Sequence, residues 1–127
     1  MKRIGFIAKN KVLAQSLASL IKNNQNLPFE PYVFKNYKQA AIDAEIFKID
    51  VAVIEMIEEV SAETGVFISL CNELRNTSPD CRILLLVPQD EKYNRDTAME
   101  AVNKKIADDY VFLDTSLDYL LAKLLAF

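Results

Sequence analysis

The segment Arg82–Val87 (RILLLV) ends in five consecutive apolar residues, so a strand formed by it would be apolar on both faces. Strands of this kind are typical of parallel sheets, in which helices cover both faces. Parallel neighbours also need crossover connections, which are usually helices. The segment therefore predicts a three-layer α/β/α sandwich in which strands and helices alternate.

The remaining sequence shows this alternation from end to end. Short apolar runs with the length of strands are separated by segments whose apolar residues recur at helical spacing. Thr115 and Asp118 resemble a capping box, which predicts that the last helix begins near Thr115. The predicted strands span residues 3–8, 29–34, 50–55, 82–87 and 109–113, and the four earlier helices span residues 11–23, 37–47, 66–75 and 95–105.

Pro31 lies inside the second predicted strand and has no backbone N–H to donate to a neighbouring strand. That strand therefore belongs at an edge of the sheet, which fits the strand order 2-1-3-4-5 of a doubly wound, flavodoxin-like fold. No linker or repeat interrupts the sequence, so we expect a single domain over residues 1–127. Sites in such folds lie at the carboxyl ends of the central strands.

Composition argues against several classes of function. The net charge is −3 and the lysines and arginines are scattered, so no face is expected to bind nucleic acid. Histidine is absent, and Cys71 and Cys81 are interpreted as buried apolar residues rather than a disulfide or metal ligands. No apolar run approaches the length of a membrane span and no signal peptide is visible, so a cytoplasmic protein is expected.

Three stretches resemble the receiver domain of bacterial response regulators, the CheY-like family of two-component signal transduction. DVAVIE (residues 50–55) resembles the family's third strand, which leads to a phosphoacceptor aspartate. IADDYVF (residues 106–112) is similar to the approach to its fifth strand, and LRNTSPDCRILLLVP (residues 74–88) to its third helix, turn and fourth strand. The resemblance covers essentially the whole chain and implies the same fold.

The resemblance also implies where the family's chemistry would lie. Two acids after the first strand hold Mg²⁺, an aspartate accepts a phosphoryl group, and a hydroxyl and a lysine contact that group. Those five positions are Ala8, Lys9, Glu55, Val87 and Leu113 here, and all five differ from the family pattern. Mg²⁺ needs oxygen ligands, and phosphoryl transfer needs neutralised charge. We therefore expect a degenerate pseudo-receiver with no catalytic residue, no Mg²⁺ and no cofactor.

Glu55 allows three interpretations. It could mimic a phosphorylated aspartate, form an ion pair with Lys9, or be an ordinary exposed acid in a loop. We favour the ion pair, because Lys9 is positioned to balance the one carboxylate of the site. Such a pair at a partly exposed crevice would contribute up to roughly 1 kcal/mol.

The end of the chain predicts an interaction surface. Tyr110 matches the family's switch aromatic, and we expect it to keep one rotamer because Val87 offers no hydroxyl trigger. The last helix is apolar beyond one face, which calls for a second burial partner. The family usually dimerises through its fourth helix, fifth strand and fifth helix. We expect a homodimer or a protein partner there, through Tyr110, Tyr119, Ala122, Ala126 and Phe127.

Three hypotheses of function follow. The first is a non-phosphorylatable signalling module, not an enzyme, that acts by protein–protein contact and could be the input part of a transcriptional regulator. The second is a domain that binds a small ligand or nucleotide in the crevice near Lys9 and Asn10. The third is a receiver that is phosphorylated through unusual chemistry.

Overall fold

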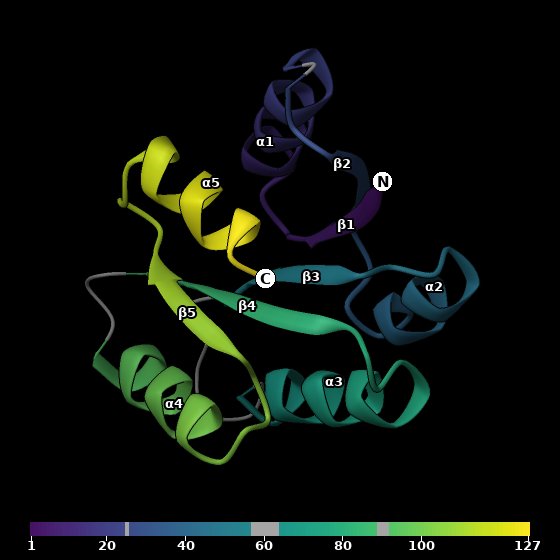
Figure 1. The fold of residues 1–127 in the computed structure, drawn as a ribbon. Coiled ribbons are helices and arrows are strands. Elements are labelled where there is room, and N and C mark those ends of the chain that lie inside the picture. Colours follow the sequence, from purple (N-terminus) through teal and green to yellow (C-terminus); the bar gives the residue numbers. More distant parts are fainter. Residues whose placement is uncertain (25, 57–63, 89–91) are drawn as a thin grey trace.

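Five parallel strands and five helices alternate along the chain in the computed structural model (Figure 1). The structure describes residues 1–24, 26–56, 64–88 and 92–127. The strands form one sheet in the order β2-β1-β3-β4-β5, which confirms the predicted doubly wound α/β fold. The elements are β1 (Lys2–Ile7), α1 (Lys11–Asn23), β2 (Phe29–Phe34), α2 (Ala40–Ile46), β3 (Val51–Glu55), α3 (Thr64–Thr77), β4 (Arg82–Val87), α4 (Lys92–Asn103), β5 (Asp109–Phe112) and α5 (Leu117–Leu125).

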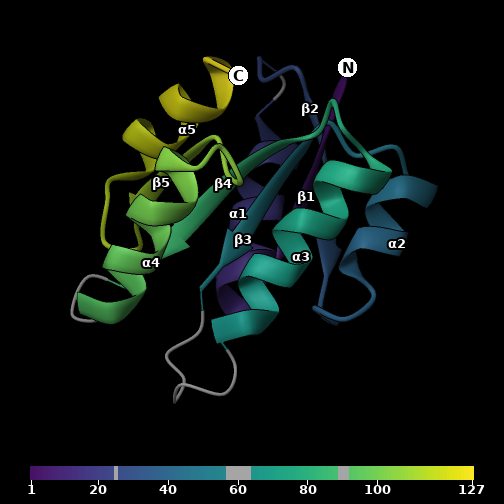
Figure 2. The same ribbon diagram turned by 90° about the horizontal axis from the view of Figure 1, so that it is seen from below.

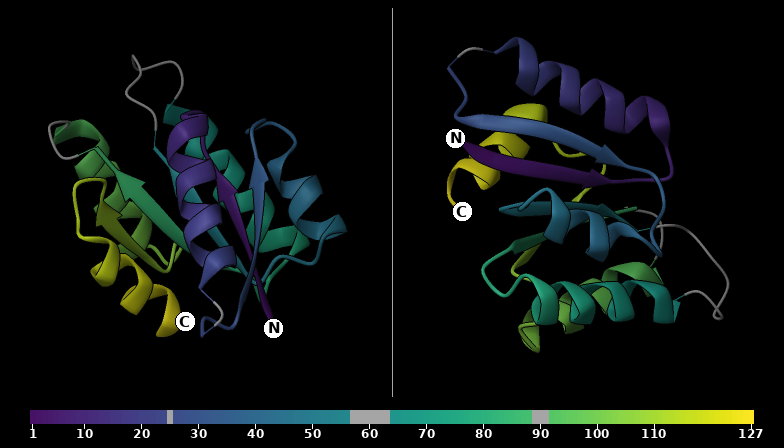
Figure 3. Two further views of the ribbon diagram at one scale, coloured as in Figure 1. Left: turned by 90° about the horizontal axis from the view of Figure 1, so that it is seen from above. Right: turned by 90° about the vertical axis from the view of Figure 1, so that its right-hand side faces the viewer.

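The sheet lies between two layers of helices. Helices α1 and α5 cover one face, and α2, α3 and α4 cover the other (Figures 2 and 3). Side chains of β4 alternate between the two cores: Ile83, Leu85 and Val87 join the cluster under α2–α4. Leu84 and Leu86 join the cluster under α1 and α5. The unbroken apolar run of β4 is thus explained by burial on both faces.

Strand β2 is an edge strand, as Pro31 predicts. It pairs with β1 alone, and Pro31 lies opposite Ile4 in that register. Among the described residues, no helix combines the length and the apolarity that crossing a membrane requires.

Two helices begin later than the sequence pattern predicts, because short polar side chains turn the backbone first. The Asn36 Oδ1 accepts a hydrogen bond from the Lys38 amide at 2.9 Å, and residues 37–39 form a turn before α2. Ser116, not Thr115, is the N-cap of α5, because its hydroxyl accepts a hydrogen bond from the Tyr119 amide at 3.2 Å. The capping box predicted for Thr115 and Asp118 is therefore wrong.

Helices α2 and α4 end in the same motif, with a lysine where glycine is usual. Lys48 follows α2 with φ of 53°, and Lys105 follows α4 with φ of 61°. The residue after each lysine donates a hydrogen bond back to the helix. The Ile49 N–H donates to the Ala44 carbonyl, and the Ile106 N–H donates to the Ala101 carbonyl. These are Schellman bonds, and they explain why α4 ends before Lys105.

A polar network ties the amino-terminal ends of β4 and β5 to α3. Arg75 donates to the carbonyls of Ile106 and Cys81, each at 3.1 Å, and to Asp108 at 2.8 Å. Asp108 also accepts from the Ile83 amide at 2.7 Å and from Arg82 at 3.2 Å. Burial opposes ionisation of Asp108, but the Ile83 amide and the two guanidinium groups together hold its pKa below the ordinary value.

We predict that Asp108→Asn lowers the free energy of unfolding by about 1–3 kcal/mol at neutral pH, because two guanidinium groups lose a charged acceptor. Since the folded-state pKa of Asp108 lies below the unfolded one, this stabilisation is present above the unfolded value and is lost as the pH falls through the folded value. Urea unfolding should therefore show a difference that shrinks in acid. Asp80→Asn, at an exposed position, is the control; a loss independent of pH would contradict the prediction.

Candidate functional site

The carboxyl edge of the sheet collects the five positions at which the receiver pattern places its chemistry. Ala8 and Lys9 follow β1, Glu55 ends β3, Val87 ends β4 and Leu113 follows β5. Glu55 lies opposite Leu86 in the β3–β4 register, and Val87 lies opposite Phe112 in the β4–β5 register. Parallel strands place their carboxyl ends at one edge, so the fold brings these positions together.

The Glu55 carboxylate is buried and is held by main-chain amides. Glu55 is 9% exposed, and no other charged residue in the described part of the chain is buried. Its Oε1 accepts hydrogen bonds from the Lys9 amide at 3.0 Å and from the Asn10 amide at 3.1 Å. Both donors belong to the turn between β1 and α1. The carboxylate therefore joins the end of one central strand to the loop that follows another.

Asn10 has two roles in this arrangement. It is the N-cap of α1, and its Oδ1 accepts a hydrogen bond from the Leu13 amide at 3.1 Å. Its own amide points to Glu55, so the carboxylate lies at the amino-terminal end of a helix of 13 residues. The partial positive charge of that helix end favours an anion. The side chain of Glu55 thus takes the place that an external anion could otherwise take.

Tyr37 closes the other side of Glu55. Its hydroxyl donates to the Glu55 backbone carbonyl at 2.6 Å. Burial, reinforced by the negative charge of Glu55, raises the pKa of Tyr37 well above its ordinary value. The phenol therefore stays protonated and keeps donating through the whole physiological range of pH.

These contacts revise the interpretations of Glu55. An ordinary exposed loop acid is wrong, because the side chain is buried. For the ion pair with Lys9, the contact that the structure describes comes from the Lys9 backbone amide, while Lys9 itself is exposed. The turn after β1 aims the Lys9 and Asn10 amides at Glu55, and the ion pair through the Lys9 ammonium stays a prediction.

The remaining positions are apolar and face different cores. Ala8 is 4% exposed and Val87 is 0% exposed. Val87 belongs to the cluster under α2–α4, whereas Leu113 packs against the cluster under α1 and α5. A hydroxyl and an ammonium group converge on a phosphoryl group in the receiver pattern. Here the equivalent side chains diverge into the two sides of the sheet and offer no polar atom.

The donor set does not fit Mg²⁺. That cation prefers an octahedron of oxygen atoms, mostly carboxylates and water. The positions that would supply two carboxylates carry Ala8 and Lys9, and one oxygen of Glu55, Oε1, already accepts from two amides. Among the described residues, no group of three acidic, cysteine or histidine side chains lies close enough to hold a metal ion.

The predicted interaction surface is partly exposed. Tyr119 is 50% exposed, and Ala122 and Ala126 are exposed beside it on α5. Tyr110 is half-buried, and its ring contacts Phe112 edge-on at a centroid distance of 5.9 Å. Phe127 differs from the others, because it packs against the core under α1 and α5. That the Tyr110 side chain keeps a single rotamer stays a prediction.

Two residues of the site were not singled out from the sequence as partners of Glu55. Asn10 precedes the first apolar position of α1, and this is a recognisable N-cap signal, although the signal says nothing of where its amide points. Tyr37 is the first residue of the second predicted helix, residues 37–47. No sequence pattern indicates that its hydroxyl would reach the end of β3.

No protein-family model and no curated protein sequence matches this chain. Solved structures do match over nearly its full length. A two-component response regulator from Clostridium difficile is 24% identical, with a TM-score of 0.75 over 99% of this chain and 94% of that chain. The beryllofluoride-activated NtrC4 receiver domain dimer is 18% identical, with a TM-score of 0.78 over 99% of this chain and 95% of that one.

A third similar structure is described as an adenylate cyclase from Rhodopirellula baltica. It is 17% identical, with a TM-score of 0.78 over 98% of this chain and 85% of that chain. Identities this low establish architecture rather than activity. The strand order, the helix layers and the near-complete overlap together lead to one conclusion: this chain has the fold of the response-regulator receiver domain.

Proposed function

We propose that residues 1–127 form one receiver-like regulatory domain that is not phosphorylated and acts through contacts with another protein. The observation that carries this proposal is the bonding of Glu55, whose Oε1 accepts two main-chain hydrogen bonds inside the fold. A phosphoacceptor needs a carboxylate oriented for in-line attack, with positive charge around the transferred group. Glu55 instead serves as an internal clamp between β3 and α1.

The charge of Glu55 also argues against a permanent mimic of the phosphorylated state. In the receiver pattern, a negative group works by attracting a hydroxyl after the fourth strand. The Glu55 carboxylate is bonded to the start of α1, and the position that would respond carries buried Val87. We therefore place the function of this domain in the surfaces that its fold presents.

A ligand or nucleotide site at Lys9 and Asn10 is less well supported. The amides of that turn are the natural anion donors there, and both already donate to Glu55. An incoming phosphate would have to displace a buried carboxylate before it could bind.

The surface formed by α4, β5 and α5 is the proposed contact. Met99 of α4 is 44% exposed and Tyr119 of α5 is 50% exposed, so apolar side chains reach solvent from both helices. Lys123 pairs with Asp109 at 2.5 Å and its ammonium lies 5.7 Å from the centre of the Tyr119 ring. These contacts hold α5 against β5. A similar solved structure, the NtrC4 receiver domain, is a dimer.

Treatment with acetyl phosphate or beryllofluoride in the presence of Mg²⁺ should leave this protein unchanged. We expect no phosphoryl adduct by intact mass and no shift of the thermal unfolding midpoint. The NtrC4 receiver domain, whose structure is known in the beryllofluoride-activated form, is the positive control for the reagent. A phosphoryl adduct on Glu55 would overturn the proposal.

Removing the clamp should cost stability in a graded way. Glu55→Ala deprives two amides of their acceptor and should lower the free energy of unfolding by about 1–3 kcal/mol. Glu55→Gln keeps an acceptor oxygen, so we expect it to lose clearly less. Urea unfolding measures both, and nitrogen-15 NMR shifts of the Lys9 and Asn10 amides report the hydrogen bonds directly.

Glu45→Ala is the matched control for the clamp, because Glu45 is exposed on α2. It should leave stability and the Lys9 and Asn10 amide shifts unchanged. Equal losses from Glu55→Ala and Glu55→Gln, or no loss from either, would mean that the hydrogen bonds to the amides are not what holds this residue.

The proposed surface predicts self-association. Sedimentation at high micromolar concentration should show a dimer, and Tyr119→Arg should shift it to monomer by adding a charge to the buried contact. Ile46→Arg, the same kind of change at a residue that is 66% exposed on α2, should leave the dimer intact. If the unmodified protein sediments as a monomer, the homodimer is excluded and a different protein becomes the proposed partner.

A further inference from the structure

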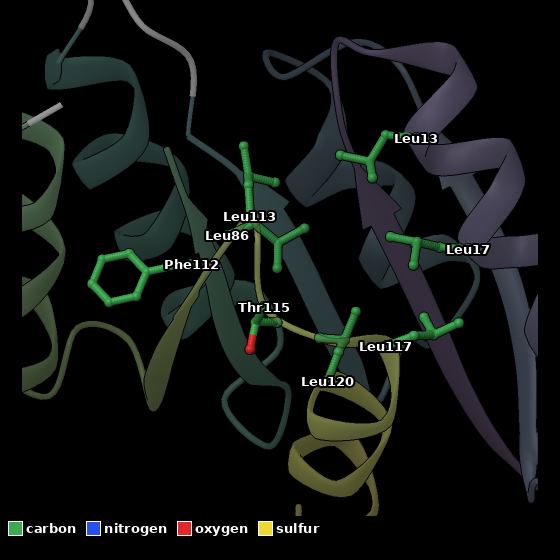
Figure 4. A pocket seen from close by; sticks show the side chains of 8 residues that line it. All are labelled: Leu13, Leu17, Leu86, Phe112, Leu113, Thr115, Leu117 and Leu120. Carbon is green, nitrogen blue, oxygen red and sulfur yellow. The ribbon is translucent and has the colours of Figure 1, made fainter. Parts of the chain in front are cut away.

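Two parts of the described surface could bring copies of this chain together outside the surface formed by α4, β5 and α5. One is a groove between α1 and α5, lined mainly by leucines, among them Leu13, Leu17, Leu117 and Leu120 (Figure 4). Apolar contacts are not directional, so this groove prescribes no arrangement of two copies. The other is the open edge of β2, which pairs with β1 alone. An open edge of this kind is a template for a second strand unless its sequence prevents pairing.

Every second residue of β2 turns its main-chain groups away from the sheet. The Lys2 amide donates to the Pro28 carbonyl at 3.0 Å, and the Ala8 amide donates to the Phe34 carbonyl at 3.3 Å. Along a parallel pair, residues that bond to the neighbouring strand alternate with residues that do not. The even-numbered residues from 28 to 34 therefore bond to β1. The main-chain groups of the three residues between them, at positions 29, 31 and 33, face outward.

Pro31 occupies the middle of these three outward positions. A two-fold axis at this point would pair the edges of two copies as antiparallel strands, with Pro31 of each copy opposite the other. Such a central pair normally exchanges both of its N–H groups, but proline has none, so both hydrogen bonds are lost. Any other register of a second strand on this edge also lacks the donor at Pro31.

The rest of β2 favours pairing. Phe29, Tyr32, Val33 and Phe34 belong to the residue types that are enriched in strands. Pro31 is the one residue of this strand that cannot donate a main-chain hydrogen bond. We propose that Pro31 closes the β2 edge to strand addition, so that a second copy of this chain does not extend the sheet there.

A closed edge also limits the size of an assembly. A two-fold contact joins the same surface of two copies, and a dimer satisfies it completely. Two such surfaces on one domain would instead join copies into an open chain. The two edges of the sheet are β2 and β5, and β5 belongs to the proposed contact surface. The limit to a dimer therefore rests on the proposed function, whereas the closure of the β2 edge does not.

Hydrogen exchange followed by nitrogen-15 NMR tests the edge in the unmodified protein. The Glu30 and Tyr32 amides face β1 and should exchange slowly, while the Phe29 and Val33 amides face outward and should exchange quickly. Equal protection of all four amides would mean that the edge is already paired, and this would overturn the proposal.

Pro31→Val restores the missing donor with a residue type that favours strands. This change is made together with Tyr119→Arg, so that the surface formed by α4, β5 and α5 does not contribute to association. Sedimentation at high micromolar concentration should show a rise in mass of about twofold over Tyr119→Arg alone, because two edges can now pair. The Phe29 and Val33 amides should become protected in the associated form.

Pro79→Val is the matched control, because Pro79 is exposed in the turn between α3 and β4. In the same Tyr119→Arg background it should leave the mass unchanged. Adding Val33→Pro to Pro31→Val moves the missing donor to the next outward position, and should return the mass to that of Tyr119→Arg alone. Circular dichroism and thermal unfolding establish that each variant is folded.

Three further outcomes would overturn the proposal. The first is a folded Pro31→Val variant whose mass does not rise. The second is an equal rise from Pro79→Val, which would indicate association without the edge. The third is association of Pro31→Val that Val33→Pro leaves intact. Each comparison is made against Tyr119→Arg, so failure of the proposed homodimer would leave these readings unchanged.

Discussion

The bond between the Glu55 carboxylate and the two amides that precede α1 is the interaction around which this fold is arranged. A buried carboxylate without such donors would cost several kcal/mol, so strand β3 and the turn after β1 must keep their relative position. That turn leads into α1, which covers one face of the sheet together with α5. The side chain of Glu55 therefore connects the central strand β3 to a covering helix.

Several of the described strand ends at the carboxyl edge of the sheet are buried as in a core. Doubly wound domains usually leave this edge open and polar, since loops there can be varied without disturbing the sheet. Here Ala8 and Val87 are buried, and Leu113 packs with α1 and α5. Among the described residues there, the Tyr37 hydroxyl donates to the backbone carbonyl of Glu55.

The sequence predicts the architecture well because burial leaves a periodic trace. The all-apolar β4 predicts helix layers on both faces, and the proline in β2 predicts an edge strand, which fits the observed order. Helix ends were predicted less accurately, because Asn36 and Ser116 act through local hydrogen bonds that several neighbouring polar residues could have made. The partners of Glu55 could not be predicted at all, since a main-chain amide is present at every residue except proline.

The clamp also bears on what it would take to give this domain a receiver's chemistry through stepwise substitution. Shortening Glu55 to aspartate would withdraw the oxygen from the Lys9 and Asn10 amides, while the other positions would still lack a metal site and a phosphoryl contact. The first step would therefore lose stability and gain no reactivity. Within this fold, the hydrogen bonds of the longer side chain therefore oppose a change of Glu55 to the aspartate of the receiver pattern.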